Sequence, residues 1–208
     1  GEINIYTFLN EDLTKNYSRS LFIDSALAKV EFENNGTIYQ REYFVSYPDS
    51  VIVCKFSANQ KEKQNLRLVF RPNPESYIEI KPIEKNEVLF CGRLKDNEMS
   101  FALRIRVEAN NGEVEINEKG EISVKGSDEV VFLLAGDTDY FMNFTPDFSD
   151  CNTYVGINPF ETTKKTFERI ETLNYQDLKQ RHLEDYCELF NRVELNLNPN
   201  ESFEDLPT

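Results

Sequence analysis

Short runs in which apolar and polar residues alternate fill most of the chain up to residue 135, and they predict β-strands. The clearest run, residues 100–108, reads SFALRIRVE, and every second side chain in it is apolar. Because successive side chains of a strand point to opposite faces of a sheet, one face of this strand is expected in a core and the other in water. Turn-forming residues separate the runs, which predict about eleven to thirteen short strands. They are expected at 2–8, 17–23, 26–33, within a hairpin at 36–58, and at 66–71, 77–80, 88–94, 100–108, three further positions ending with 130–135, and 140–144.

The segment 36–58, GTIYQREYFVSYPDSVIVCKFSA, is predicted to form a β-hairpin. Its two runs are rich in β-branched and aromatic residues, which fit the pleated, half-buried surface of a sheet. Pro48 fixes the backbone φ for a turn and Asp49 can accept hydrogen bonds from nearby backbone amides, so the chain is expected to reverse between the runs. One face of the second run is predicted to carry Ile52, Cys54, Phe56 and Ala58.

The periodicity changes after Pro159. Apolar residues in 160–173 and 175–191 lie three and four positions apart, which is typical of helices. Residues 192–198 alternate again and predict a short final strand. The second helix is expected to carry an apolar stripe formed by Leu178, His182, Tyr186 and Leu189.

Length and composition agree with this pattern, because 208 residues with 16 Phe and 10 Tyr are sufficient to build a sizeable core. We therefore predict a mainly β fold. A large antiparallel β-sandwich domain is expected at residues 1–158, followed at residues 159–208 by a helical linker of two helices and the final strand.

The charge of the chain narrows the classes of partner. A formal net charge of −14 and a pI of 4.6 would repel nucleic acids and anionic membranes, and the scattered Lys and Arg residues form no basic groove. For this reason no nucleic-acid partner is expected. No run of 18 apolar residues occurs, so no membrane partner is expected either. The net charge would not disfavour the binding of neutral glycans.

Candidate catalytic and metal-binding residues are few. His182 is the single histidine, which rules out a multi-histidine metal site, and its position on an apolar helix stripe favours a structural role. Asp137, Asp139 and the acidic residues of 147–150 lack the spacing of a calcium loop, which favours solvated carboxylates. The 37 acidic residues offer many pairs for acid–base hydrolysis, and the sequence does not rank them.

The remaining candidates also favour structural roles. No Gly-rich phosphate-binding or dinucleotide-binding motif is present, so no cofactor is expected. The four cysteines form no metal-type spacing and are interpreted as small buried residues, with disulfide formation left open; they are Cys54, Cys91, Cys151 and Cys187. Four tyrosines could stack on sugar rings, although packing in or beside the core is preferred for them; they are Tyr39, Tyr43, Tyr140 and Tyr154.

Two separated stretches carry a resemblance to a known family. The first contains, in order, Tyr17-Ser18-Arg19-Ser20-Leu21, Ala28-Lys29-Val30, Gly36, Tyr39, Arg41-Glu42, Phe44, Ser46, Pro48-Asp49 and Val51. The second contains Tyr175, Leu178, His182, Asp185-Tyr186, Leu189-Phe190, Arg192-Val193, Leu195, Leu197 and Leu206-Pro207-Thr208. In order and spacing they resemble the N-terminal β-sandwich of glycoside hydrolase family 95, the inverting α-L-fucosidases, and the helical linker that follows it.

The resemblance implies a division of labour within a longer protein. In the family, the general acid and the residues that position the attacking water belong to a downstream (α/α)6 barrel, and GNGRLG-like and NE-x-x-W-like motifs lie upstream of the position of Gly1. The resemblance therefore implies a fragment that lacks the first strands of the sandwich and carries no catalytic, cofactor-binding or metal-binding residue. Its partner would be its own barrel. The parent would hydrolyse α-L-fucosyl linkages of fucosylated glycans in the periplasm or outside the cell, and the chain alone would be inactive.

Other interpretations stay open beside this one. The chain could be a carbohydrate-binding β-sandwich module, or the sandwich domain of another barrel glycosidase or phosphorylase, such as a relative of maltose phosphorylase. Binding to fucosylated oligosaccharides would distinguish a module from a supporting domain. Arg41 and Glu42 are expected to maintain the geometry of strand and loop. An unpaired strand edge is expected to favour a homodimer.

Overall fold

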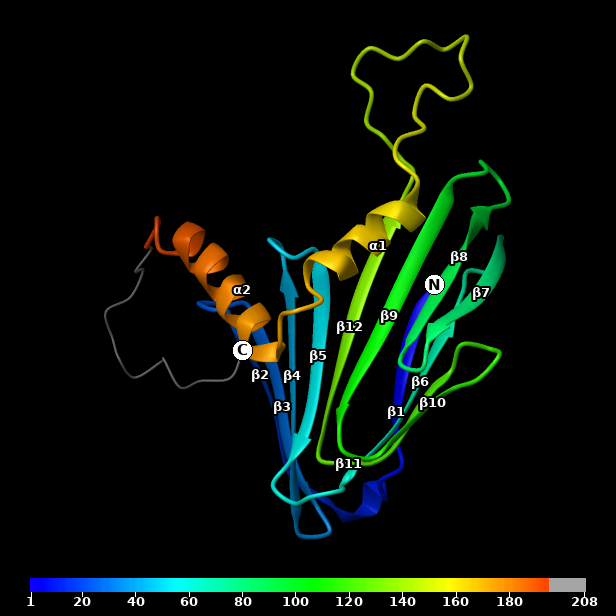
Figure 1. Cartoon of the computed structure of the whole chain (residues 1–208). Helices are drawn as coiled ribbons and strands as arrows, with labels where there is room; N and C mark the ends of the chain where they lie inside the picture. Colours follow the sequence, from blue (N-terminus) through cyan, green and yellow to red (C-terminus); the bar gives the residue numbers. More distant parts are fainter. Residues whose placement is uncertain (195–208) are drawn as a thin grey trace.

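The computed structural model describes residues 1–194 and contains two antiparallel sheets and two helices (Figure 1). This confirms the predicted mainly β fold. No helix of the described residues is long and apolar enough to cross a membrane. The strands are β1 (Glu2–Thr7), β2 (Thr14–Phe22), β3 (Leu27–Asn34), β4 (Thr37–Ser46), β5 (Val51–Ala58), β6 (Gln64–Arg71), β7 (Ser76–Glu84), β8 (Glu87–Leu94), β9 (Ser100–Asn110), β10 (Glu113–Ile116), β11 (Ile122–Ser127) and β12 (Glu129–Thr138), and the helices are η1 (Glu11–Leu13, a 3-10 turn), α1 (Pro159–Arg169) and α2 (Tyr175–Phe190).

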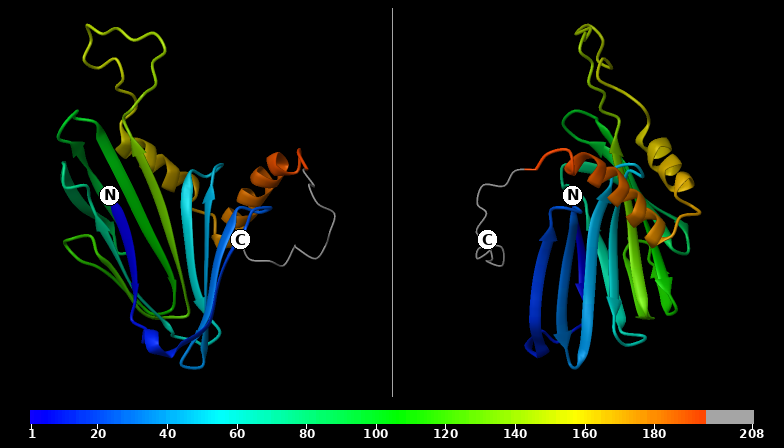
Figure 2. Two further views of the ribbon diagram at one scale, coloured as in Figure 1. Left: turned by 180° about the vertical axis from the view of Figure 1, so that it is seen from behind. Right: turned by 90° about the vertical axis from the view of Figure 1, so that its left-hand side faces the viewer.

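The two sheets form the layers of a sandwich. The large sheet has eight strands in the order β2-β3-β4-β5-β12-β9-β8-β7, and the small sheet has four in the order β1-β6-β11-β10. The core between them contains Leu68, Phe90 and Phe132, each at most 1% exposed. Both helices lie on the other side of the large sheet, as the right-hand view of Figure 2 shows. The small sheet therefore covers part of the inner face of the large sheet, and the helices cover part of its outer face.

Strand β9 shows where the alternation pattern was right and where it was wrong. Ile105 and Val107 face the sandwich core and are almost fully buried, as predicted. The opposite face is not in water, because Ala102 is 2% exposed and Arg104 is 8% exposed. Helix α1 packs across the outer face of β9 and β12 and buries it.

The predicted hairpin at 36–58 is confirmed as β4 and β5, with a turn at 47–50. Asp49 does not cap backbone amides as expected. Its fully buried carboxylate accepts hydrogen bonds from the Ser46 hydroxyl at 2.8 Å and from the guanidinium of Arg181 at 2.9 Å. The turn is thereby tied to helix α2.

Helices α1 and α2 each begin at an asparagine. The side chain of Asn158 accepts a hydrogen bond from the first turn of α1, and Asn174 forms a reciprocal capping box with Asp177 in α2. The helix predicted at 160–173 ends at Arg169, because Ile170 is its C-cap and a turn follows before the N-cap of α2 at Asn174. The helices form a third layer, in which Phe167, Ile170 and Leu178 pack on Phe44, Val53 and Leu133 of the sheet.

The last two predicted strands differ from the structure. The strand expected at 140–144 is reduced to a single bridge between Tyr140 and Val155, within a loop of turns at 139–158 that projects beyond the sheets (Figure 1). Of the strand expected at 192–198, residues 192–194 form the end of a turn and irregular backbone, and the rest lies outside the described residues.

The thiols of the four cysteines are free. Cys91 is buried as predicted, Cys54 and Cys187 are half-buried, and Cys151 is exposed on the projecting loop. Burial raises the pKa of the Cys54 thiol to about 12 and also raises the pKa of the Cys91 thiol.

Alkylation should therefore discriminate between these thiols. Only the thiolate of a cysteine reacts, and burial disfavours the thiolates of Cys54 and Cys91. We expect iodoacetamide to modify Cys151 first and to modify Cys54 and Cys91 much more slowly until the protein is unfolded. Peptide mass mapping gives the order, and native labelling of Cys54 as fast as that of Cys151 would contradict the raised pKa of the Cys54 thiol.

Candidate functional site

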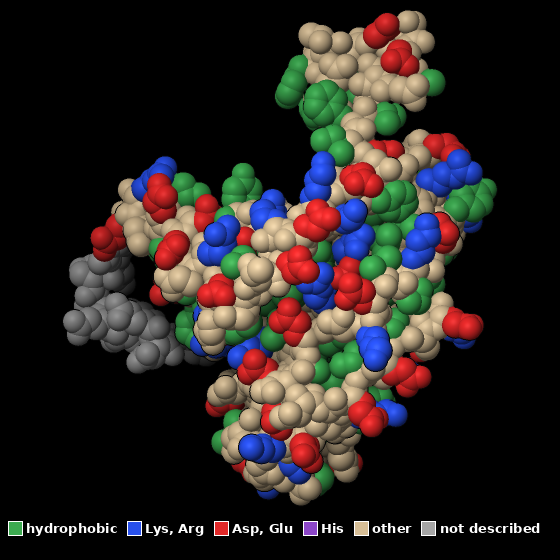
Figure 3. All heavy atoms as spheres, viewed as in Figure 1, with side chains coloured by type: hydrophobic (Ala, Val, Ile, Leu, Met, Phe, Trp, Pro, Cys, Tyr) green, Lys and Arg blue, Asp and Glu red, His purple; other side chains and the backbone are tan. Residues whose placement is uncertain are grey.

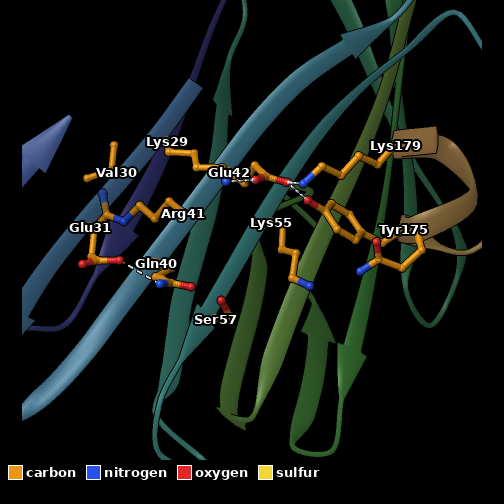
Figure 4. Close-up of a pocket in the computed structure, with 11 residues that line it drawn as sticks. Lys29, Val30, Glu31, Gln40, Arg41, Glu42, Lys55, Ser57, Tyr175 and Lys179 are labelled. Atoms are coloured by element: carbon orange, nitrogen blue, oxygen red, sulfur yellow. Dashed lines mark hydrogen bonds and ion pairs between the residues drawn. The ribbon is translucent and has the colours of Figure 1, made fainter. Parts of the chain in front are cut away.

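A polar pocket lies on the outer face of the large sheet, where β3, β4 and β5 meet the first turns of α2 (Figure 4). Its volume is about 290 Å³. The strand register sets Glu42 beside both Lys29 and Lys55, and Gln40 beside Glu31 and Ser57, so polar side chains of three strands meet there. The walls consist of Lys29, Val30, Glu31, Gln40, Arg41, Glu42, Lys55, Ser57, Tyr175, Gln176 and Lys179.

Glu42 is the centre of this pocket. One of its carboxylate oxygens accepts hydrogen bonds from the Tyr175 hydroxyl and, at 2.6 Å, from the ammonium group of Lys179. The other oxygen forms an ion pair with Lys29 at 3.2 Å. The Glu42 side chain is 13% exposed, so helix α2 is fastened to β4 through a largely buried carboxylate. Lys55 completes the junction by lying 4.2 Å from the centre of the Tyr175 ring.

The pocket offers hydrogen-bonding groups but no arrangement for hydrolysis. Inverting glycoside hydrolysis needs an acid and a base about 6.5–9.5 Å apart with room for water between them. Both oxygens of Glu42 are already occupied by donors, and Glu31 accepts a hydrogen bond from Gln40 at 2.7 Å. Ser57 has no histidine beside it among the lining residues. The geometry fits a structural junction with polar walls.

Arg41 and Glu42 are neighbours in β4, and their side chains lie on opposite faces of the sheet. The Arg41 guanidinium lies 5.0 Å from the centre of the Phe32 ring and 5.8 Å from that of Phe56, on the sandwich side. These contacts agree with the expected structural role of the pair. The partner of Glu42 is nevertheless helix α2, which sequence reasoning did not identify, because the contact spans more than 130 residues.

His182 lies in α2 and is 4% exposed. Its Nε2 atom is 3.0 Å from the backbone carbonyl oxygen of Ser25, and its ring stacks on Phe44 with 5.0 Å between ring centres. A carbonyl oxygen and an aromatic ring satisfy the imidazole and offer it no nucleophile to activate. The structure agrees with the predicted structural histidine.

The acidic loop residues are occupied by local hydrogen bonds. Asp139 accepts from the Ser100 amide at 2.9 Å. The Ser149 hydroxyl and amide both donate to Asp147, and these bonds lower the pKa of the Asp147 carboxyl. Within residues 1–194 no three His, Cys, Asp or Glu side chains lie together in a way that could hold a metal ion.

The four candidate tyrosines divide into two pairs. Tyr39 is buried and Tyr43 is partly buried against the core, as expected. Tyr140 and Tyr154 were expected in or beside the core, and this was wrong, because they are 52% and 37% exposed and stack on each other at 6.2 Å. They lie at the base of the loop 139–158, which leaves the sheets and offers no core to enter.

The loop 139–158 also exposes other apolar side chains that the pattern analysis did not single out. Phe144 and Phe148 are 90% and 85% exposed, and Ile157 is 73% exposed. Figure 3 shows apolar side chains on this projection, above a face on which acidic and basic side chains are interspersed. The signal available in the sequence was the density of aromatic residues in a segment without strand or helix periodicity.

A buried ionic cluster beneath α1 was also missed. One oxygen of the Glu87 carboxylate forms an ion pair with Arg104 at 2.5 Å, and the other forms an ion pair with Arg106 at 2.7 Å. The Glu87 side chain is 4% exposed, and the Arg106 guanidinium also lies 4.8 Å from the centre of the Phe167 ring of α1. The cluster lies between the sheet and the helix, where it joins β8 and β9 to α1.

Comparison with known proteins identifies relatives over most of the chain. A model of the family described as glycosyl hydrolase family 65, N-terminal domain, matches residues 1–143. The chain is 27% identical over 204 residues to alpha-L-fucosidase 2 of Arabidopsis thaliana and 26% identical over 202 residues to probable alpha-fucosidase A of Aspergillus niger. These alignments cover 88% and 92% of the chain but 24% of each relative, so the chain spans about a quarter of their length.

A solved structure extends the comparison at the level of the fold. A putative kojibiose phosphorylase from the human microbiome superposes with a TM-score of 0.55 at 10% identity, over 89% of this chain and 27% of that chain. The resemblance to α-L-fucosidase sandwich domains is thus confirmed, while the matching family model carries the name of family 65.

Proposed function

Because the chain belongs to the family of glycosyl hydrolase family 65 N-terminal domains, we propose that it is a non-catalytic sandwich domain that supports the catalytic barrel of a longer glycosidase. The parent is assigned to glycoside hydrolase family 95, and its reaction is the inverting hydrolysis of α-L-fucosyl linkages. The observation that carries this proposal is the similarity over about nine tenths of the chain to two α-fucosidases of which it covers 24%.

The surface for the barrel is assigned to the end of the molecule that carries the loop 139–158. Phe144 and Phe148 expose apolar rings there, and Asn143 and Asp147 fix the loop through hydrogen bonds to Thr145 and Ser149. A loop with exposed aromatic residues is typical of a contact between domains. On this proposal the loop and the helices after it form the contact with the barrel.

The chain alone is expected to show no turnover of an aryl α-L-fucoside, whereas its full-length parent should hydrolyse this substrate. The comparison measures release of the aryl alcohol by both proteins at equal molar concentration. Turnover by a clean preparation of the chain would contradict the supporting role. An inactive parent would contradict the fucosidase assignment.

The docking surface has its own test in the parent protein. Replacing Phe144 and Phe148 by serine should lower the melting temperature of the parent, since each buried aromatic side chain contributes about 1.5–3 kcal/mol. The same replacements should leave the isolated chain unchanged, because both rings are exposed in it. Ile83→Ser, at a 44% exposed position on β7, is the control. An equal effect in both proteins would contradict docking through this loop.

A carbohydrate-binding module is the second candidate. The exposed stacked pair of Tyr140 and Tyr154 favours it, because aromatic faces bind sugar rings. Calorimetry with fucosylated oligosaccharides separates the two functions, since a supporting domain is expected to give no binding heat.

A further inference from the structure

A hollow of about 310 Å³ lies on the outer face of the large sheet, at the end of the molecule from which the loop 139–158 projects (Figure 1). The strand register sets Tyr77 of β7 beside Arg93 of β8, and Arg93 beside Ser100 of β9, so these side chains form a row across three strands. Cys91 is 1% exposed and lies in the next row, at the floor. Phe160 in the first turn of α1 forms the wall on the side of the helix. Three strands and one helix thus fix the walls of the hollow.

Two aromatic rings border the hollow. Tyr77 is 56% exposed, whereas Phe160 packs against the sheet and is half-buried. The Arg93 guanidinium lies 5.4 Å from the centre of the Tyr77 ring, and the Lys81 ammonium group lies 5.9 Å from that of Phe160. Aromatic rings at the rim of a hollow offer flat apolar surface to a ligand, and here they do so with polar groups within reach.

The charged groups around the hollow are balanced in sign. Arg93 forms an ion pair with Glu98 at 2.5 Å, and Lys81 forms one with Glu79 at 2.9 Å. The four side chains are between 46% and 65% exposed. Exposed ion pairs contribute little to stability, so these groups can exchange partners with a ligand at small cost. Because cationic and anionic groups are equal in number, the hollow favours neither an anion nor a cation.

We propose that this hollow binds one sugar unit of a neutral glycan. The C–H face of the sugar ring packs on Tyr77, and Phe160 closes the side next to α1. The sugar hydroxyls donate hydrogen bonds to Glu79 and accept them from Arg93 and Ser100. A sugar ring is apolar on its faces and carries donors and acceptors around its edge. It therefore matches aromatic walls that are combined with a few uncompensated polar groups of both kinds.

This inference goes beyond the supporting role, which requires no sugar site in the sandwich, and its failure would leave that role unaffected. A ligand of about a dozen non-hydrogen atoms on an open surface is expected to bind with a Kd of about 1–10 mM. Such binding is too weak to give measurable heat with micromolar protein. A supporting domain that carries this site is therefore still expected to give no binding heat in calorimetry.

NMR titration of the isotope-labelled chain tests the site. The probes are L-fucose, D-galactose and D-glucose, added to about 100 mM, which is about ten times the upper end of the expected Kd. We expect the amide shifts of Tyr77, Gly92, Ser100 and Phe160 to change together and to saturate. Tyr77→Ala should weaken binding at least about fivefold, because the ring supplies the apolar surface. Tyr17→Ala is the matched control and should leave the Kd unchanged, since Tyr17 is 61% exposed on β2, at the opposite edge of the same sheet.

Two charged sugars, D-glucuronate and D-glucosamine, test whether the ligand is neutral, and both should bind no more tightly than D-glucose. Tighter binding of either charged sugar, shift changes confined to Tyr140 and Tyr154, or no shift change at the highest concentration would each overturn the proposal. Unchanged binding by Tyr77→Ala would overturn it as well. The shift changes of the original chain locate the site without any substitution, so the test does not depend on how well the variant folds.

Discussion

Replacing Glu87 by alanine is expected to lower the free energy of unfolding by about 3–5 kcal/mol, the usual cost of removing one partner from a buried ionic cluster. The carboxylate neutralises Arg104 and Arg106, whose side chains are 9% and 20% exposed. Without it, two largely buried cations remain between the large sheet and α1 with no carboxylate to neutralise them. For a chain of this size the melting temperature should fall by about 10 °C.

Urea denaturation followed by circular dichroism measures this loss. Glu79→Ala provides the matched control, because Glu79 forms an exposed pair with Lys81 at 2.9 Å, and exposed pairs contribute about 0–1 kcal/mol. Replacing Glu87, Arg104 and Arg106 together by apolar residues should recover much of the stability, since no unpaired charge is then left buried. A loss below about 1 kcal/mol for Glu87→Ala would mean that the arginines find other partners.

The alternation of side chains predicted most strands correctly because it is a local property. In β9 the same alternation failed to predict how the second face is used. Arg104 looks solvent-facing in the sequence, yet it is buried by α1, which begins more than fifty residues later. The ionic cluster needs the register of β8 against β9, which pairs Glu87 directly with Arg106. No spacing within one strand encodes that register.

The candidate site shows the same division between local and long-range information. The turn at Pro48 and Asp49 and the buried positions Leu178 and His182 could be predicted from nearby residues, whereas Leu189, the last residue of the predicted apolar stripe, is 58% exposed. The contact between Glu42 and Tyr175 joins segments 133 residues apart, so the sequence offered a charged pair at 41–42 without its partner. The loop 139–158 escaped prediction for a different reason. Its aromatic residues resembled core residues, and exposure is decided by the packing around them.

Replacing Glu42 by leucine is also expected to have a large effect on stability, because it should release helix α2 from the sheet. The carboxylate is bound by Tyr175, Lys179 and Lys29, of which Lys29 is 46% exposed and therefore contributes least. Hydrogen bonds to charged groups contribute about 1.5–3 kcal/mol, so we expect a loss of about 2–4 kcal/mol when the two partners on α2 are left unpaired. Glu42→Gln keeps an acceptor of the same shape and should lose less.

The location of the loss distinguishes an anchor from a general stabilising contact. If Glu42 fastens α2, hydrogen exchange in Glu42→Leu should accelerate first in α2, while β8 and β9 on the far side of the sheet stay protected. Glu31→Gln is the control, because Glu31 lines the same pocket but accepts its hydrogen bond from Gln40 within the sheet and not from helix α2. Uniform acceleration across all strands would contradict the anchor. A local release would identify this junction as the contact that anchors α2 to the large sheet.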